Sequence, residues 1–444
     1  MNHVSRILTI GFPLLAGNLS MYLYRLADSL MVGRLGVDAL AAIAVATVYT
    51  AVHEMFIWPT ALGTQAIASR RYGRDSGTRE TESVREVLPQ AVWAGSLTGG
   101  VAFFLALGAS VFVPLFAAAS TDDAIGYVSI SRVAFPIMGV ASGFRGYLAA
   151  VHRTRIIMIS IVASNVVNVA VNALFIFGWG PIPAFGVRGA AVGTVVAHAL
   201  NAIVLGAAVL RTRAHCGRPP VTPHWPMVQR ILRIGLPVAI QNAIAMLVIL
   251  LYQWMLGALG ALYQAVTYVL FSSFRLNKTL VGGFANGASI LVGNALGRND
   301  QQQARHIVRS QQMVAGGIGF LVFVAVLLFP GAVARAFALT GEAKTLLVVG
   351  LRFFAPFFLV EVLAYSLEIV FTHNGWGRYV LMSEAVTNLG GIVAITALAV
   401  FVFSWGHWGA WAGFATYQVG HAVILGYGLR SGRWLHAAVE ESHA

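Results

Sequence analysis

The first residue whose type and position could do chemistry is Asp28, a carboxylate within an apolar stretch of membrane length, Ile7–Gly36. An ionisable group placed in hydrocarbon is costly and is therefore a functional hypothesis by default. Asp28 could bind a proton or Na⁺ and later release it. Arg25 precedes it by about one helical turn, so a structural ion pair on the same helix is the alternative.

Amide side chains recur in the fifth apolar stretch of the chain. Asn168 and Asn172 are four residues apart and share one helix face, so both could turn inward and hydrogen-bond Asp28. Asn165 lies on the same stretch, and Thr194 on the next one could join them. Amides that only bridge helices would give the same pattern, because such bridges are common in membrane proteins.

Charged residues also occupy the middle of three further apolar stretches. Glu54 lies 224 positions before Lys278 (278 − 54), and Arg275 precedes Lys278 by one turn. These opposite charges could lock the two halves of the chain together or bracket a substrate. Glu361 and Glu368, two turns apart, could pair with Lys278 instead, and we expect at least one of them to face a cavity.

Other polar and aromatic residues have simpler interpretations. We expect His53 to be a packed, hydrogen-bonded histidine, and Glu384 to be solvated near the cytoplasmic surface. Pro13 and Pro59 lie inside long helical stretches and should bend them. Several aromatic residues could stack on a flat cation, although packing explains each of them equally well. These residues are Trp58, Tyr252, Trp254, Tyr268, Phe271 and Tyr365.

The stretches that position these residues occur in two copies. Ile231–Gly260 repeats Ile7–Gly36 at an offset of 224 residues (231 − 7) without a gap. The residues that recur identically at this offset include Ile7, Leu8, Ile10, Gly11, Pro13, Asn18, Gly33, Leu35, Gly36, Gly63, Gly73 and Arg74. Shared apolar composition does not explain so long an echo, so the sequence predicts two copies of one membrane unit.

The composition predicts an all-α polytopic membrane protein. Of the 444 residues 58% are hydrophobic and 10% charged, with a mean hydropathy of +0.76. A soluble domain carries about a quarter charged residues, whereas apolar runs of about 20 residues cross a bilayer. We predict twelve spans, six per copy, at 7–33, 38–68, 88–113, 125–150, 156–177, 187–210, 231–257, 261–293, 312–332, 343–372, 379–403 and 407–429.

Charges in the short loops predict the orientation. Arginines follow the second, fourth and eighth spans, whereas the alternate loops are poor in Lys and Arg. The positive-inside rule then places both termini in the cytoplasm and the chain in the inner membrane. An even number of spans per copy makes the repeats parallel. We predict an N-terminal lobe over 1–211, a Pro-rich cytoplasmic linker over 212–230, a C-terminal lobe over 231–430 and a cytoplasmic tail over 431–444.

Other classes of protein fit the sequence poorly. The net charge of +13 comes with scattered arginines, which suit anionic headgroups better than nucleic acid. The single Cys216 permits no internal disulfide. The first apolar run is too long for a signal-peptide core. We find no metal-ligand set, P-loop or nucleophile elbow, so we expect no enzyme and no cofactor, and any pumping should draw on an ion gradient.

Several motifs together resemble the multidrug and toxic compound extrusion (MATE) family. They are Pro13…Asn18-Leu-Ser…Asp28-Ser-Leu-Met-Val-Gly-Arg-Leu-Gly, Gly63-Thr-Gln-Ala…Arg71-Tyr-Gly, Phe144-Arg-Gly-Tyr and Gly186-Val-Arg-Gly-Ala-Ala-Val-Gly-Thr194. The resemblance covers most of the first half, and the internal repeat extends it to the second. It implies twelve helices in two pseudo-symmetric six-helix lobes, and export of organic, often cationic compounds in exchange for H⁺ or Na⁺.

The resemblance also implies roles for particular residues. Asp28 would be the coupling carboxylate of the first lobe, and Pro13 would mark a bend in the first helix. Many prokaryotic members carry Asp where this sequence has Asn172. Na⁺-coupled members carry Glu on the seventh helix, where this sequence has Ala245, and an acid on the tenth, where only the nearby Glu361 offers itself. These departures favour H⁺ over Na⁺ as the coupling ion.

The leading hypothesis is therefore a monomeric, proton-coupled antiporter that exports cationic or amphipathic small molecules by alternating access. A Na⁺-coupled exporter is one alternative. A lipid-linked precursor flippase of the same superfamily is another, with Arg275 and Lys278 gripping a phosphate, although such proteins commonly carry extra spans. The same two cations leave room for an anionic or zwitterionic substrate. An intramembrane enzyme is a third alternative, but its polar residues should cluster at one membrane face.

Overall fold

The computed structural model describes residues 3–75, 81–115, 121–212, 222–337 and 339–437. Across these residues the chain is helical, and the only extended pairing is an isolated bridge between Trp179 and Ile182. About 20 residues of helix cross a bilayer. Many of the helices are longer than this, because several continue into the polar loops.

The described part of the first half of the chain contains nine α-helices. They are α1 (His3–Gly33), α2 (Val37–Asp75), α3 (Glu82–Arg85), α4 (Val87–Leu105), α5 (Ala109–Phe112), α6 (Thr121–Ser131), α7 (Ala134–Ala150), α8 (Thr154–Phe177) and α9 (Val187–Thr212). Two short 3-10 turns, η1 (Ala106–Gly108) and η2 (Val113–Leu115), flank α5 and continue the third predicted span.

Seven α-helices lie in the second half, within residues 222–337 and 339–437. They are α10 (Trp225–Leu259), α11 (Ala261–Gly297), α12 (Gln301–Leu328), α13 (Pro330–Ala336), α14 (Gly341–Phe371), α15 (Gly377–Thr387) and α16 (Gly406–Ser431). π-Helical segments η4 (Thr372–Trp376), η5 (Asn388–Ile395) and η6 (Leu398–Val402) join and extend α14 and α15, and a 3-10 turn η7 (Arg433–His436) follows α16.

All twelve predicted spans fall on helical segments, although those at 88–113, 125–150 and 379–403 each comprise more than one segment, and the twelve-helix prediction is confirmed. Length and hydropathy alone find nine spans among the described residues, or ten if α6 and α7, bent by 42°, form one. The difference has two causes. The stretch Gly341–Val402 contains two spans, which are separated by non-helical backbone at Asn374 and Gly375. The last span, α16, is more polar than the others.

The contacts divide the chain into two compact units. The N-terminal unit comprises residues 16–239 and 293–299, and the C-terminal unit comprises 1–15, 240–292 and 300–438. Two of the division points lie inside helices, after Leu15 in α1 and after Ala239 in α10. Each point follows a proline by two residues, Pro13 or Pro237, and the two points are related by the sequence offset of the repeat. Bends at Pro13 and Pro59 remain predictions, because both lie within continuous helices.

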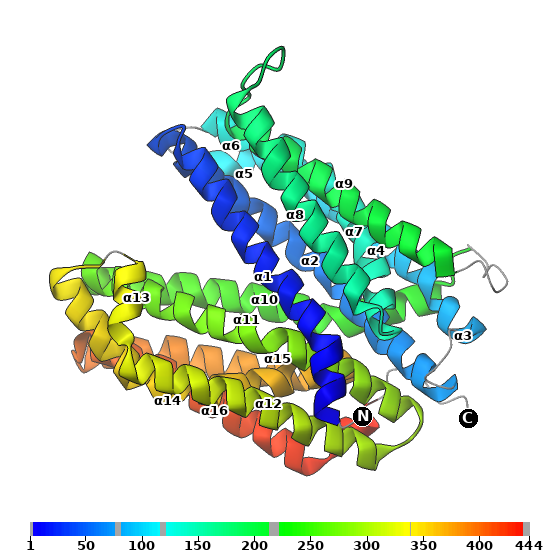
Figure 1. Cartoon of the computed structure of the whole chain (residues 1–444). Coiled ribbons are helices and arrows are strands. Elements are labelled where there is room, and N and C mark those ends of the chain that lie inside the picture. The colour runs from blue at the N-terminus through cyan, green and yellow to red at the C-terminus, as the bar shows by residue number, and fades with distance from the viewer. Residues whose placement is uncertain (1–2, 76–80, 116–120, 213–221, 338, 438–444) are drawn as a thin grey trace. The chain divides into compact units, whose positions relative to one another are not determined.

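The N-terminal unit is a bundle in which small residues let helices approach closely. Helix α8 packs along α9, and α7 packs against α2, α4 and α9 (Figure 1). A Cβ added at Gly95 of α4 would lie 2.0 Å from the carbonyl oxygen of Gly139 in α7, and one added at Gly139 would lie equally close to Gly95. Only glycine permits this backbone contact.

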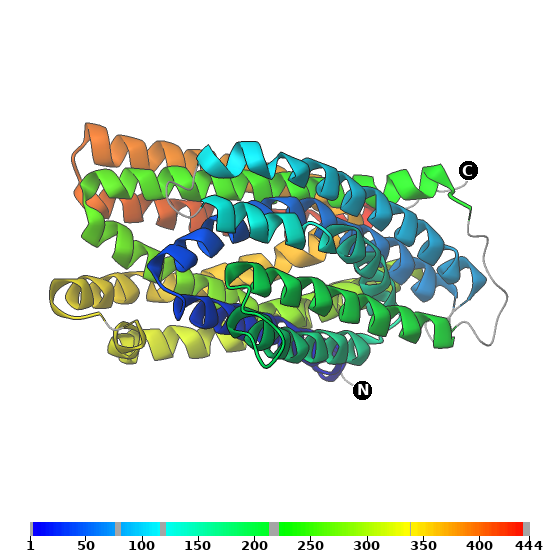
Figure 2. The same cartoon turned by 90° about the horizontal axis from the view of Figure 1, so that it is seen from above.

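The C-terminal unit has an aromatic core. Helix α14 packs against α12 and α16, and α13 lies at one end of the unit, in yellow in both views (Figures 1 and 2). Phe274 of α11 stacks on Phe358 of α14, with ring centroids 4.1 Å apart, and Phe354, Trp411 and Phe414 surround the pair. This apolar core leaves the polar side chains of the same helices to gather elsewhere in the unit.

The sequence repeat is visible as repeated backbone geometry. Gly36 (φ 118°) and Gly260 (φ 129°) make the same turn after α1 and α10. Gly178 follows α8 in the sequence Phe-Gly-Trp-Gly (177–180) and has a φ of 76°. Ser404 holds the same place in the matching sequence Phe-Ser-Trp-Gly (403–406) of the second copy, and its φ of 56° lies in the left-handed region. Glycine adopts a positive φ without steric cost, whereas serine adopts it only at a cost. The two halves therefore share the turn itself and not the residue type.

The predicted linker is shorter than expected. Helix α10 begins at Trp225, so residues 225–230 are helical and not part of an extended linker. Pro226 lies in the first turn of α10, where proline is tolerated because its missing N–H has no helical partner to lose. The predictions for Cys216, Pro219 and Pro220 fall outside the described residues.

Candidate functional site

Asp28 receives a hydrogen bond from the predicted amide of α8. The Nδ2 atom of Asn172 lies 2.6 Å from Asp28 Oδ1 and 3.0 Å from Asn168 Oδ1. Asn168 and Asn172 are both buried. The hydrogen bond expected between Asp28 and the fifth span is therefore present, and Asn168 supports it indirectly by orienting the amide of Asn172.

A glycine of α9 fixes the position of that amide. The Oδ1 atom of Asn172 is buried without a hydrogen-bond partner among the described residues. It lies against Gly193, where an added Cβ would be only 1.8 Å away. The close packing of α8 on α9 thus leaves space for the Asn172 side chain only because residue 193 has none, and this holds Nδ2 toward Asp28.

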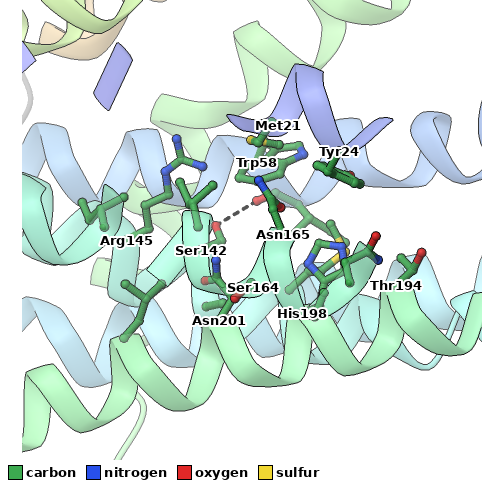
Figure 3. Close-up of a pocket in the computed structure, with 18 residues that line it drawn as sticks. Met21, Tyr24, Trp58, Ser142, Arg145, Ser164, Asn165, Thr194, His198 and Asn201 are labelled. Carbon is green, nitrogen blue, oxygen red and sulfur yellow. Dashed lines mark hydrogen bonds between the residues drawn. The ribbon is translucent and has the colours of Figure 1, made fainter. Parts of the chain in front are cut away.

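A small cavity of about 60 Å³ lies beside these residues, between α1, α2, α7, α8 and α9. Asn165, Asn168 and Thr194 line it (Figure 3). Asn165 donates to Ser20 Oγ at 2.8 Å, which ties α8 to α1. The Thr194 hydroxyl donates to the carbonyl of Ala190 at 3.0 Å, so Thr194 joins the cavity wall.

The other polar residues that line this cavity were not predicted from the sequence. The guanidinium of Arg145 lies 5.2 Å from the ring centroid of Trp58, a cation–π contact between α7 and α2. Tyr24, His198 and Asn201 also line the cavity (Figure 3). Arg145 belongs to the Phe144-Arg-Gly-Tyr motif, and His198 and Asn201 are polar residues in an apolar span, which is the signal that could have found them.

The other predicted residues of this unit take less specific positions. The side chain of Arg25 lies outside the described residues. Glu54 is half-buried on α2. The neighbouring His53 is a packed histidine, as expected: its Nδ1 atom is 2.8 Å from the carbonyl oxygen of Tyr49, and its ring stacks on Phe135.

A larger cavity of about 280 Å³ lies in the C-terminal unit. Lys278 Nζ is 3.9 Å from Glu361 Oε1 and 5.3 Å from the ring centroid of Tyr365. Asn277 donates to the other carboxylate oxygen of Glu361 at 3.0 Å. Of the two interpretations left open for Lys278, the structure shows the pairing with an acid of the tenth span. Arg275 is an exposed residue that lines the same cavity.

The second acid of α14 also faces this cavity. Glu368 accepts a hydrogen bond from Gln241 at 2.6 Å and, like Glu361, lines the cavity wall. The prediction for Glu384 was wrong. It is 5% exposed and accepts hydrogen bonds from Tyr417, at 3.1 Å, and from Asn388. The break before α15 places Glu384 two turns inside the helix, beyond the reach of solvent at the helix end.

Most of the aromatic candidates serve packing. Tyr252 is fully buried, stacks on Phe271 and donates to the carbonyl of Ala410 at 2.8 Å. Trp254 and Tyr268 are 67% and 57% exposed, which suits contact with lipid or headgroups. Trp58 and Tyr365 differ, because each lines a cavity and lies beside a cation.

Buried carboxylates and amides beside internal cavities, carried by two copies of a helical unit, define the class of multi-pass membrane proteins with transporter architecture. The sequence model of the MatE family matches residues 13–174 and 237–396, one match in each half of the chain. The chain belongs to this family.

Relatives of known name and solved structures agree with this assignment. The probable multidrug resistance protein NorM of Neisseria meningitidis serogroup B is 22% identical over 342 residues, which cover 74% of this chain and 72% of the relative. Its namesake in Thermotoga maritima is 23% identical over 376 residues, 83% of this chain and 78% of the relative. An outward-facing multidrug resistance MATE family transporter of the MOP superfamily superimposes with a TM-score of 0.87 at 20% identity, over 100% of this chain and 98% of that one.

Proposed function

We propose that the chain is a secondary active antiporter that exports organic compounds in exchange for protons, with Asp28 as the coupling carboxylate. The observation that carries this proposal is the partly buried hydrogen bond from Asn172 to Asp28, beside a cavity lined by polar residues. An ionisable group at such a site responds directly to what binds next to it. The relatives named multidrug resistance proteins support the choice of organic compounds as substrates.

The donor groups around Asp28 favour a proton over Na⁺. Hard cations take several oxygen ligands, and an amide N–H directed at the carboxylate occupies a position where a cation would bind. Asn172 presents its nitrogen, not its oxygen, to Asp28, because the same nitrogen also donates to Asn168. A carboxylate that already accepts an N–H donor needs only a proton to become neutral.

In this mechanism substrate and proton exclude each other at Asp28. On the outward side, a lower pH protonates Asp28, cancels its charge and favours release of a cationic substrate. On the cytoplasmic side, Asp28 loses the proton and becomes able to hold the next substrate. Alternating access then converts the proton gradient into export, as expected for transporters built from repeated units.

The C-terminal cavity supports cationic or amphipathic substrates. Three acids, Glu361, Glu368 and Glu384, line it together with Lys278 and Arg275. Lys278 is already matched with Glu361, so the cavity retains an excess of carboxylates that a cationic group could approach. The same pairing weakens the flippase alternative, since that function requires Lys278 to grip a phosphate.

The arrangement in the cell follows from the sequence alone. We propose a monomer in the cytoplasmic membrane with both termini in the cytoplasm, because arginines crowd the loops after the second, fourth and eighth spans. The bilayer and the small-molecule substrate are then its binding partners.

The test uses purified protein in liposomes that contain a pH-sensitive dye. A proton gradient is imposed, a panel of organic cations is added, and the experiment is repeated with Asp28→Asn and with a Na⁺ gradient. We expect proton movement that depends on the substrate in the native protein and is absent in Asp28→Asn. A response to the Na⁺ gradient alone would replace H⁺ by Na⁺, and substrate-dependent proton movement that persists in the variant would remove Asp28 from the mechanism.

A further inference from the structure

Three side chains from three helices converge at one point of the C-terminal unit. They are Glu368 of α14, Glu384 of α15 and His421 of α16. His421 Nε2 lies 3.4 Å from Glu384 Oε1 and 3.7 Å from Glu368 Oε2, and one donor atom from each residue lies within 4.8 Å of the other two. We propose that this triad binds a divalent transition-metal ion of the zinc type, a site separate from the proton coupling at Asp28.

The first argument is the state of His421. Its side chain is buried, and Nε2 has no hydrogen-bond partner among the described residues although it is aimed at two carboxylates. A buried polar atom left without a partner is energetically costly. The other ring nitrogen, Nδ1, lies 3.0 Å from Ser383 Oγ. When Nδ1–H donates to that hydroxyl, the lone pair of Nε2 points toward the carboxylates, and a cation between them satisfies all three groups.

The second argument is that the triad is supported by further hydrogen bonds. Gln241 donates to Glu368 Oε1 at 2.6 Å, and Asn388 donates to Glu384 Oε2. These bonds hold one oxygen of each carboxylate and leave Glu368 Oε2 and Glu384 Oε1 directed at His421. Metal ligands in proteins are oriented by such outer hydrogen bonds, which include a partner for the second nitrogen of a ligating histidine.

The third argument is size. Donor atoms about 2.0 Å from a tetrahedral zinc ion lie about 3.3 Å from one another. The separations from His421 Nε2, 3.4 and 3.7 Å, are close to this value, whereas the two carboxylate oxygens, within 4.8 Å of each other, would draw together around the ion. Imidazole and carboxylate are both ligands of zinc, and a set of three protein ligands leaves a fourth position open.

Charge and access also fit a divalent cation. Two ionised carboxylates and a neutral imidazole carry a net charge of −2, which a divalent ion cancels, so the metal and a cationic substrate would compete for these two acids. Glu368 and Glu384 line the 280 Å³ cavity, so the fourth position can hold water or a substrate donor atom. Lys278 lines the same cavity but is matched with Glu361, an acid outside the triad. The competing interpretation is a protonated His421 that bridges the two carboxylates without a metal.

The experiment titrates Co²⁺ into the purified full-length chain, after treatment with a chelator and removal of any affinity tag. Co²⁺ coordinated by nitrogen and oxygen donors absorbs visible light, and Zn²⁺ should displace it. We expect one equivalent of Co²⁺ per chain and an affinity at least about 100-fold weaker in His421→Gln and Glu384→Gln. His373→Gln, which alters a neighbouring group outside the triad, should bind Co²⁺ like the native chain.

Two results would overturn the proposal. One is the absence of stoichiometric Co²⁺ binding in the native chain, which would leave the protonated histidine as the explanation. The other is binding that persists in correctly folded His421→Gln, because the ion would then lie elsewhere. If His421→Gln fails to fold, Glu384→Gln and Glu368→Gln provide the same test. Proton-coupled transport at Asp28 does not depend on either outcome.

Discussion

Replacing Gly193 by alanine should impair coupling through Asn172 while leaving Asp28 itself intact. The added Cβ would lie 1.8 Å from Asn172 Oδ1, whereas real Cβ contacts begin near 3.0 Å. The amide must therefore retreat by at least 1.2 Å (3.0 − 1.8). Clearing the added Cβ turns the amide, which also moves Nδ2, and the 2.6 Å bond between Asn172 and Asp28 can lengthen by only about 0.6 Å (3.2 − 2.6) before it leaves the hydrogen-bonding range.

The magnitude follows from the lost bond. A hydrogen bond to a charged group contributes about 1.5–3 kcal/mol, which corresponds to a factor of about 10 to 150. We expect the initial rate of proton-coupled exchange in liposomes to fall by this factor in Gly193→Ala. Asn172→Ala should show a similar loss, and the double variant should lose no more than the single ones, because both changes remove the same interaction.

Gly189→Ala is the matched control. Gly189 lies one turn earlier on α9, and its added Cβ would meet the carbonyl oxygen of Phe175 at 2.4 Å, so it disturbs the packing of α8 on α9 but not Asn172. If Gly189→Ala loses coupling as strongly as Gly193→Ala at equal thermal stability, packing and not the amide is responsible. Full exchange in a folded Gly193→Ala, or a double variant whose losses multiply, would refute the role of Asn172.

Two further predictions concern stability, measured as thermal unfolding in detergent. Lys278→Met should destabilise the protein by about 3–5 kcal/mol, because it leaves the Glu361 carboxylate buried without its cation. Adding Glu361→Gln to this variant should recover most of the lost stability. No recovery would mean that the ion pair is not the cause. Gly297→Ala should cost about 1–3 kcal/mol, since its Cβ would lie 2.0 Å from the carbonyl oxygen of Arg70. Gly100→Ala, which has open space around it, should have no effect, and an equal loss there would contradict the packing argument.

The fold could be predicted from the sequence because its signals are local or repeated. Long apolar runs specify membrane helices, and the gapless repeat specifies that the second half folds like the first. The positive φ angles of Gly36 and Gly260 show that equal spacing produced equal turns. The start of α10 at Trp225 could not be predicted from the prolines around it. Prolines favour an extended linker, but the first turn of a helix also accepts proline.

The candidate site could be predicted only in part. The contact between Asn172 and Asp28 followed from residues four apart on one helix face, a property of the helix itself. The position of Glu384 did not follow, because its depth depends on where the break at Asn374 and Gly375 restarts the helix. His421 is one of two histidines in the last span, and its importance becomes visible only when three helices bring it beside Glu368 and Glu384.

The central claim, that a proton and the substrate compete at Asp28, is tested most directly by counting protons released when substrate binds. An organic cation from the transport panel is added to purified protein in weakly buffered detergent solution, and the pH change is recorded. The account predicts proton release by the native chain and by the control Glu342→Gln, which changes an exposed acid in the first turn of α14, and none by Asp28→Asn at saturating substrate. Substrate binding without proton release in the native chain, or equal release in Asp28→Asn, would contradict it.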